Sequence, residues 1–273
     1  MQRKRVVMTL LAICTITIVL CFIFLAGCRR GYTPTSRRQP ATIADIAYDV
    51  NRRGDYRIFI NENGSYVSYL VLTADYGGNV LLLREFLLDE TVQFNPSPHG
   101  VGMWSWQDYG SYYPDSYIDN FLNANFMGML GNAVHSVIVP SNIVVTDKSS
   151  IGVSGRASYT IARYVFLLSL RELAVSDPST SVPEGEALKF FQGFHTVRVA
   201  RFSSGMASPY WTRTPNNWDT ATVFTIGPNA SGTGSADVYS GVRPAFSVLR
   251  YTAITTSTDI ISSQTVFVLD TGN

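Results

Sequence analysis

The chain has 273 residues, with 21 basic and 20 acidic side chains and therefore a formal net charge of +1. The basic residues are scattered along the sequence, so a nucleic-acid-binding surface is not expected. Hydrophobic residues make up 46% of the chain and charged residues 15%, a balance that can bury a core and that excludes an intrinsically disordered protein.

The N-terminus has the pattern of an export signal. The basic segment Arg3 to Arg5 precedes an uncharged run from Val6 to Phe24, and the tetrapeptide Leu25-Ala26-Gly27-Cys28 follows. Small residues before a cysteine resemble the bacterial lipobox, in which the cysteine is acylated and becomes the first residue of the mature protein. We therefore expect residues 1–27 to be a lipoprotein signal peptide and Cys28 to carry the lipid.

An uncleaved membrane anchor is the alternative, because about 20 apolar residues suffice to span a bilayer. Both readings leave the basic end in the cytoplasm and the rest of the chain outside it. The expected location is therefore extracytoplasmic, on a bacterial membrane.

Cys14, Cys21 and Cys28 are the three cysteines of the sequence. The mature chain would therefore have no thiol beyond its anchor, which excludes internal disulfides, zinc ribbons and cysteine nucleophiles.

The segment 28–42 is rich in Pro, Arg and hydroxyl residues and predicts a flexible tether. Residues 43–273 then form one globular domain. The apolar spacing predicts a short helix over 43–51, and β-branched and aromatic runs predict strands over 56–60, 66–73 and 80–86. Residues 95–114 carry several Trp, Tyr and Gly without periodicity and are expected to be a long loop.

Two capping-box patterns mark helix starts. Ser116 with Asp119 opens a helix that Gly128 and Gly131 close, and Ser169 with Glu172 opens a second one. A third helix is expected over 184–192. The remaining expected strands are extended segments over 134–145, 163–168, 210–214, 221–226, 237–249 and 265–269, with a hairpin turn near Ala230. Helices and strands alternate without a βαβ rhythm, so the predicted class is α+β, with short twisted antiparallel sheets and a few short helices.

Four segments occur in an order that resembles a known family. They are Tyr113-Pro-Asp-Ser-Tyr-Ile-Asp-Asn-Phe-Leu-Asn123, Arg163-Tyr-Val-Phe-Leu-Leu-Ser169, Tyr210-Trp-Thr-Arg-Thr-Pro215 and Gly241-Val-Arg-Pro-Ala-Phe246. Together they resemble the bacterial domain of unknown function DUF6273, over about 56–249. The resemblance implies an extracytoplasmic module whose core is similar to C-type lectins and formylglycine-generating enzymes. It brings no catalytic residues with it.

Motifs for catalysis are missing from the sequence. There is no Gly-x-Ser-x-Gly elbow, no Gly-Lys-Ser/Thr phosphate loop and no metal-binding histidine spacing, because His99, His135 and His195 are isolated. No cofactor or metal is therefore expected. Carboxylates such as Asp108, Asp115 and Asp219 leave a glycoside hydrolase open as an alternative, since their spacing in the fold decides that chemistry.

The candidate ligand-binding residues are aromatic rings with polar neighbours in two segments. A flat ring stacks on the apolar face of a sugar or on a partner side chain, and nearby amides and carboxylates fix its orientation. Trp211 is expected in the core and Trp218 at the surface, while Arg213 has either a structural or a ligand-facing role. The candidates are Trp104, Trp106, Tyr109, Tyr112, Arg213, Asn216, Asn217, Trp218 and Asp219.

The sequence thus predicts a non-catalytic module, held on a membrane by an N-terminal lipid, that binds a glycan or a cell-envelope partner. A cell-envelope hydrolase and a purely structural or assembly protein are the alternatives.

Overall fold

The computed structural model describes residues 41–51, 56–176, 178–193, 195–261 and 264–269. The chain separates into two compact units, Met1–Gln39 and Pro40–Asn273. The expected signal peptide, Cys28 and nearly all of the expected tether lie outside the described residues. Among the residues that are described, no helix is both long enough and apolar enough to cross a bilayer.

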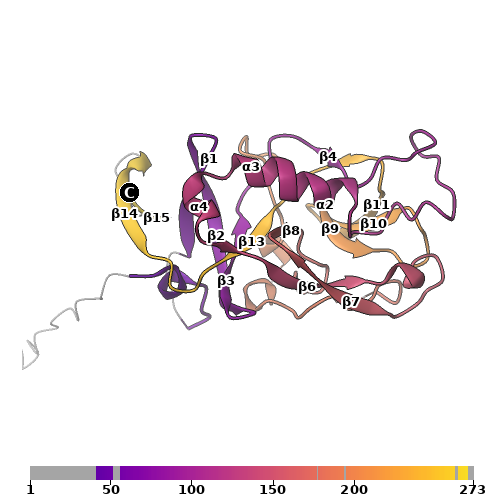
Figure 1. Ribbon diagram of the computed structural model, residues 1–273, viewed down its shortest axis with the longest axis horizontal. Coiled ribbons are helices and arrows are strands. Elements are labelled where there is room, and N and C mark those ends of the chain that lie inside the picture. The colour runs from indigo at the N-terminus through magenta and orange to yellow at the C-terminus, as the bar shows by residue number, and fades with distance from the viewer. Residues whose placement is uncertain (1–40, 52–55, 177, 194, 262–263, 270–273) are drawn as a thin grey trace, which may run out of the picture. The chain divides into compact units, whose positions relative to one another are not determined.

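The second unit is built on a curled eight-stranded sheet (Figure 1). Seven strands follow the order β14-β15-β1-β2-β3-β13-β5, and β8 also pairs with β13. Strands β1 and β15 run parallel, and the other neighbours are antiparallel. The strands are β1 (Arg57–Glu62), β2 (Ser65–Tyr76), β3 (Asn79–Arg84), β5 (Ile138–Val139), β8 (Val165–Phe166), β13 (Ala245–Val248), β14 (Ile254–Ile261) and β15 (Gln264–Leu269).

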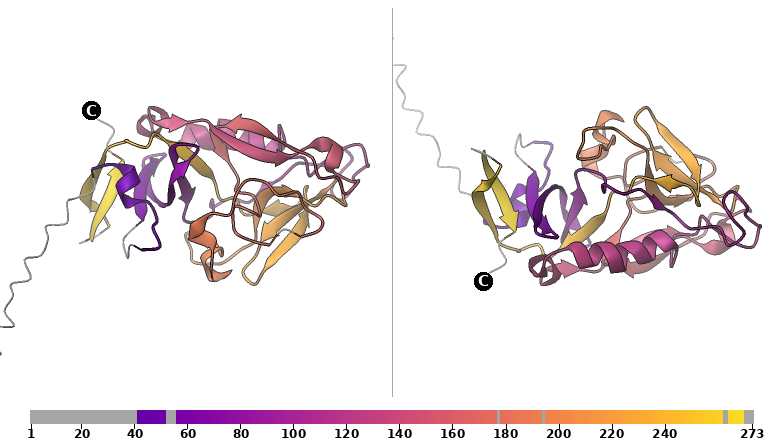
Figure 2. Two further views of the ribbon diagram at one scale, coloured as in Figure 1. Left: turned by 90° about the horizontal axis from the view of Figure 1, so that it is seen from below. Right: turned by 90° about the horizontal axis from the view of Figure 1, so that it is seen from above.

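Three smaller sheets complete the strands. They are β11-β10-β9, the pair β12-β4 and the pair β6-β7. The helices within residues 117–135 and the β6–β7 hairpin lie on one side of this unit, and β9–β11 lie on the other (Figure 2). The strands are β4 (Val92–Gln93), β6 (Ser141–Thr146), β7 (Ser158–Arg163), β9 (Tyr210–Pro215), β10 (Thr222–Ile226), β11 (Ser231–Ser235) and β12 (Tyr239–Ser240).

The helices are short, and most are single turns. They are η1 (Ile43–Ile46), α2 (Tyr117–Phe121), η2 (Leu122–Phe126), α3 (Met127–Met129), α4 (Asn132–His135), η3 (Lys148–Ser150), η4 (Lys189–Phe191) and η5 (His195–Val197). The fold is therefore mixed α+β and mostly strand, as the sequence predicts.

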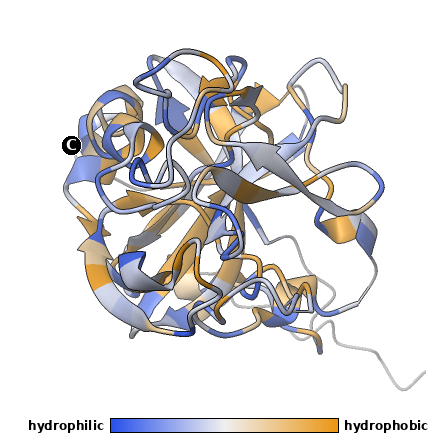
Figure 3. Cartoon of the chain, turned by 90° about the vertical axis from the view of Figure 1, so that its right-hand side faces the viewer, coloured by the Kyte–Doolittle hydropathy of each residue, from blue (hydrophilic) through white to orange (hydrophobic). Residues whose placement is uncertain are grey.

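The core lies along the central strands of the large sheet. Ser68 to Leu72 of β2 and Val80 to Arg84 of β3 are buried without alternation, which means that both faces of these strands are covered. Hydrophobic residues gather on the central strands and hydrophilic residues on the surrounding loops (Figure 3). The four family segments all supply this core, through Tyr113, Phe166, Trp211 and Phe246.

Several element predictions are wrong in detail. The second capping box forms both of its hydrogen bonds, Glu172 N to Ser169 Oγ and Ser169 N to Glu172 Oε2, each 3.0 Å. It closes only one turn, because Ala174 adopts a φ of +52° and ends it. The helix predicted over 184–192 is reduced to η4. Val134 and His135, at the start of the segment predicted to be extended, belong to the helix α4.

Candidate functional site

The two segments that carry the predicted aromatic residues lie side by side. One is the long loop over 95–114, which has no helix or strand, and the other joins β9 to β10. The Ser111 backbone N–H donates to the Thr220 carbonyl at 2.9 Å, and the Ser111 hydroxyl donates to the same oxygen at 3.1 Å. These two loops, far apart in the sequence, are therefore hydrogen-bonded to each other at a buried position.

A third loop, residues 148–155, joins them and was not predicted from the sequence. The Asn217 carbonyl accepts from the backbone N–H groups of Gly152 at 2.8 Å and Ser154 at 3.3 Å. The Asn217 side chain donates to the Gly155 carbonyl at 2.8 Å. A Cβ at Gly152 would lie 3.7 Å from the Trp106 ring, so this turn packs directly against that indole. In the sequence, the glycines of this loop are the feature that indicates a close approach by a neighbouring side chain.

Two of the three indole rings in these loops are exposed. Trp106 is 69% exposed and Trp218 61% exposed, and Val153 in the third loop is 70% exposed. Trp104, in contrast, is half-buried and lies over Gly110, where a Cβ would come within 2.4 Å of its ring. Trp104 therefore holds its own loop in place, whereas Trp106 and Trp218 face solvent.

A lysine lies against two of the three tyrosines of the long loop. The Lys148 ammonium lies 4.7 Å from the ring centroid of Tyr109 and 5.6 Å from that of Tyr112, which is cation–π geometry. The Tyr112 hydroxyl shares a short hydrogen bond with Tyr159. The pKa of Tyr112 is raised above its ordinary value, mainly by burial and secondly by this bond. We call the four residues Trp106, Tyr109, Tyr112 and Trp218, on the two joined loops, the aromatic face.

The polar candidates of the β9–β10 loop mostly bind their own backbone. Asn216 Oδ1 accepts from the Trp218 N–H at 3.3 Å, and Asp219 Oδ1 accepts from the Ala221 N–H at 2.7 Å. Asn217 is 1% exposed, and its Oδ1 is buried without a hydrogen-bond partner. These residues shape the loop around Trp218.

Arg213 lies away from the aromatic face and is completely buried. Its guanidinium forms two hydrogen bonds with Glu172, at 2.7 and 2.9 Å, and donates to the carbonyls of Val144 and Leu167. Glu184 lies 3.9 Å from the same guanidinium. Arg213 therefore lies beside two carboxylates inside the protein and pairs directly with Glu172.

Glu184 is the more weakly paired of these two carboxylates. It accepts from the backbone and hydroxyl of Thr146 and from the hydroxyl of Thr214. Burial raises the pKa of Glu184 to about 7, against the opposing effect of Arg213. One buried cation thus lies beside two carboxylates, and the pKa of one of them, Glu184, is raised to near neutrality.

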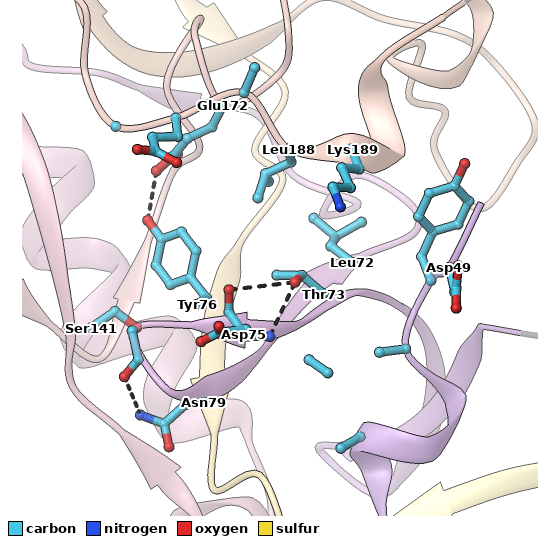
Figure 4. A pocket seen from close by; sticks show the side chains of 18 of the residues that line it. Asp49, Leu72, Thr73, Asp75, Tyr76, Asn79, Ser141, Glu172, Leu188 and Lys189 are labelled. Atoms are coloured by element: carbon cyan, nitrogen blue, oxygen red, sulfur yellow. Dashed lines mark hydrogen bonds between the residues drawn. The ribbon is translucent and has the colours of Figure 1, made fainter. Parts of the chain in front are cut away.

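Glu172 also lines a cavity of about 770 Å³. The Tyr76 hydroxyl donates to the Glu172 carboxylate at 2.6 Å. Figure 4 shows Thr73, Asp75 and Tyr76 on one strand facing Glu172, Leu188 and Lys189 across an open space. The sequence analysis did not predict this cavity, because its lining residues come from segments that lie far apart in the sequence.

The three carboxylates considered for hydrolysis each have separate partners. Asp108 lies 3.3 Å from His99, Asp115 lies 3.1 Å from Arg163, and Asp219 caps its own loop. Within the described ranges, no group of three His, Cys, Asp or Glu side chains is placed to hold a metal ion.

Comparison with known proteins identifies the family. Residues 77–249 match the family described as "Domain of unknown function (DUF6273)". No curated protein and no solved structure matches the chain.

Proposed function

The chain belongs to the DUF6273 family, and we propose that it is a non-catalytic binding module that recognises a glycan or a cell-envelope partner through the aromatic face. The observation that carries this proposal is the exposure of Trp106 and Trp218, 69% and 61%, on two loops that are hydrogen-bonded to each other. When a ligand covers a large ring, the ring's apolar surface is removed from water, and this favours binding.

The backbone beneath these rings is fixed before any ligand arrives. Ser111 joins the two loops, and Asn217 joins the β9–β10 loop to the 148–155 turn. A preorganised surface loses little conformational entropy on binding, so more of the contact free energy remains as affinity. The separate engagement of Asp108, Asp115 and Asp219 favours binding over hydrolysis.

A C-type-lectin-like core and a lipid anchor are part of the same proposal. The lectin-like core is supported by the mixed α+β fold, in which the four ordered motifs share one hydrophobic core. The lipid anchor is supported by the sequence Leu25-Ala26-Gly27-Cys28 after an uncharged run. The expected location is the extracytoplasmic side of a bacterial membrane.

The anchor is tested by labelling cells with a palmitate analogue. The wild-type protein should take up the label and shift to its processed size, and Cys28→Ser should abolish both changes, because an alcohol replaces the acylated thiol. Processing of the Ser variant at residue 28 would show that an ordinary signal peptidase acts and that the lipoprotein assignment is wrong.

The binding function is tested with a screen of glycans and envelope polymers on the purified full-length protein, read for retention and for turnover. Trp106→Ala and Trp218→Ala should each weaken binding by about 1 to 3 kcal/mol, the scale of an aromatic hot spot. Tyr251→Ala is the matched control, because Tyr251 is 81% exposed and lies outside the aromatic face. Retention unaffected by both tryptophan variants, or turnover of a polymer, would refute the proposal.

A further inference from the structure

The 770 Å³ cavity is a separate site in the same unit. Its walls come from Glu172 and from four segments: residues 44–51, the end of β2 with the β2–β3 turn, the start of β6, and residues 185–189. None of these segments belongs to the aromatic face. A concave space of this size is in the range of small-molecule sites, which span about 300 to 1,000 Å³.

One wall is held rigidly from behind. The Glu172 carboxylate accepts four hydrogen bonds, from Tyr76, Ser169 and twice from Arg213. A Cβ at Gly185 would lie 2.9 Å from Glu172, so the chain passes directly over this carboxylate. Because all of its lone pairs face donors, Glu172 positions the wall and has little capacity left for a ligand.

The rim, in contrast, has free hydrogen-bonding capacity. Among the described residues, the side chains of Asn142, Glu186 and Lys189 make no hydrogen bond or ion pair, and all three are exposed. Asp75 uses one oxygen to accept from the Gly78 N–H at 3.1 Å, which leaves the other oxygen for a ligand. An amide, two carboxylates and an ammonium supply both donors and acceptors, which is what ligand hydroxyl groups require.

The rest of the lining is apolar and small. Ala44, Ala47, Leu72, Ala74 and Leu188 border the same space. The charge balance of the lining is acidic, because Arg213 compensates Glu172 and the remaining charged side chains are three carboxylates and one ammonium, those of Asp49, Asp75, Glu186 and Lys189. An anionic ligand would therefore meet repulsion, and an amine would be attracted.

From this combination we propose that the cavity binds a short saccharide that is uncharged or carries amino groups, with its hydroxyls on Asp75, Asn142 and Lys189 and an amine beside Glu186. The apolar lining covers the carbon face of a sugar ring. This site lies beyond the binding function proposed for the aromatic face, and each of the two can be wrong without the other.

The test titrates the full-length protein, kept soluble in a detergent without a sugar head group, by isothermal titration calorimetry. The probes are glucosamine oligomers, neutral glucose oligomers and galacturonic acid oligomers. We expect the amino oligomers to bind most tightly, the neutral ones about 5- to 10-fold more weakly, and the acidic ones not at all. Equal binding of the acidic oligomers, or no binding of any class, would overturn the inference.

Two variants locate the bound saccharide. Glu186→Gln should weaken the amino oligomers about 5- to 10-fold and change the neutral ones less than about 2-fold, because only the amine loses a charge partner. Ala187→Trp should fill the mouth from an exposed lining position and weaken both classes by at least about 10-fold. Glu90→Gln is the charge-matched control on an exposed residue that does not line the cavity.

Thermal melts of each variant confirm that the fold is intact. The double variant of Trp106→Ala with Trp218→Ala should bind the oligomers as the wild type does. If that double variant abolishes binding and Ala187→Trp does not, the saccharide sits on the aromatic face, so the cavity inference is wrong while the proposed function stands.

Discussion

Trp211 and Trp218 belong to one strand-and-loop segment but occupy opposite environments. Trp211 is 1% exposed, its indole N–H donates to the Val92 carbonyl at 2.8 Å, and its ring packs edge-on against Phe94. Truncation to alanine should therefore cost about 3 to 5 kcal/mol of unfolding free energy. Trp218 is 61% exposed, so Trp218→Ala should change the unfolding free energy by less than about 0.5 kcal/mol.

Chemical denaturation of both variants measures this difference. If Trp218→Ala were the more destabilised of the two, its ring would belong to the core and could not be a ligand contact. The result does not depend on knowing the ligand, so it tests the placement of the aromatic face by itself.

Glu184 gives the molecule a pH-dependent stability. Its pKa is about 7 in the folded protein and 4.5 as the ordinary value, because burial disfavours the charged form. Below pH 4.5 both states hold the proton. As the pH rises from 4.5 to 7, the unfolded chain releases its proton first, so stability falls by at most about 3 kcal/mol and then levels off.

Glu184→Gln should remove this part of the pH dependence, because an amide keeps the shape of the side chain and does not titrate. Burial also raises the pKa of Asp119, so the informative quantity is the wild-type curve minus the variant curve between pH 4.5 and 7.5. Parallel curves for the two proteins would mean that Glu184 ionises normally inside the fold.

At the scale of elements, one close approach holds the long loop. A Cβ at Gly110 would lie 2.4 Å from the Trp104 ring, so Gly110→Ala should displace that ring and cost about 1 to 3 kcal/mol. The matched control is Gly128→Ala in α3, where nothing lies within 4 Å of the added atom. That change should stabilise the helix by about 0.5 to 1 kcal/mol.

Urea unfolding of the two glycine variants checks the contrast. Equal effects of the two substitutions would indicate that Trp104 moves aside without cost and that the loop is not held by this contact.

The two capping boxes show how far local patterns could predict the elements. Ser116 does cap α2, since its hydroxyl accepts from the Asp119 N–H at 3.3 Å. The Asp119 carboxylate, however, accepts from the Asp115 N–H and from Arg163 instead of closing the box. At Ser169 the box closes but no helix follows. A capping motif therefore predicts a turn, and long-range contacts decide whether a helix continues.

The candidate site was predictable to the extent that exposed aromatic rings follow from composition. The long loop, the core position of Trp211 and the exposure of Trp218 match the sequence analysis. The burial of Arg213 did not follow from its neighbours, because Glu172 meets it only in the folded chain. The same holds for the cavity, whose walls come from Glu172 and four distant segments.

At the scale of the whole molecule, the sheet extends past the family match. That match begins at residue 77 and ends at 249, but β1 and β2 pair in register with each other and β2 pairs with β3. Ile58, Ile60 and Val71 of these strands are buried in the common core. The matched segment is therefore only part of the unit that buries the core.

A buried ion pair also links β1, which lies outside the family match, to β3 inside it. Glu62 in β1 accepts from Arg84 in β3 at 3.0 Å, and both side chains are nearly inaccessible. The Tyr69 hydroxyl of β2 also donates to Glu62. Removing β1 and β2 would take away the carboxylate partner of Arg84 and would also expose the edge and the apolar face of β3 that these strands cover.

A fragment of residues 77–249 should therefore fail to fold, whereas residues 40–273 should unfold cooperatively. The lost ion pair, the exposed β3 edge and the uncovered core face should together exceed the stability of a typical domain, about 5 to 15 kcal/mol. Near-ultraviolet circular dichroism and thermal melts distinguish the two fragments. A cooperative melt of the 77–249 fragment would show that β1 and β2 are accessory strands and that the family segment is an independent folding unit.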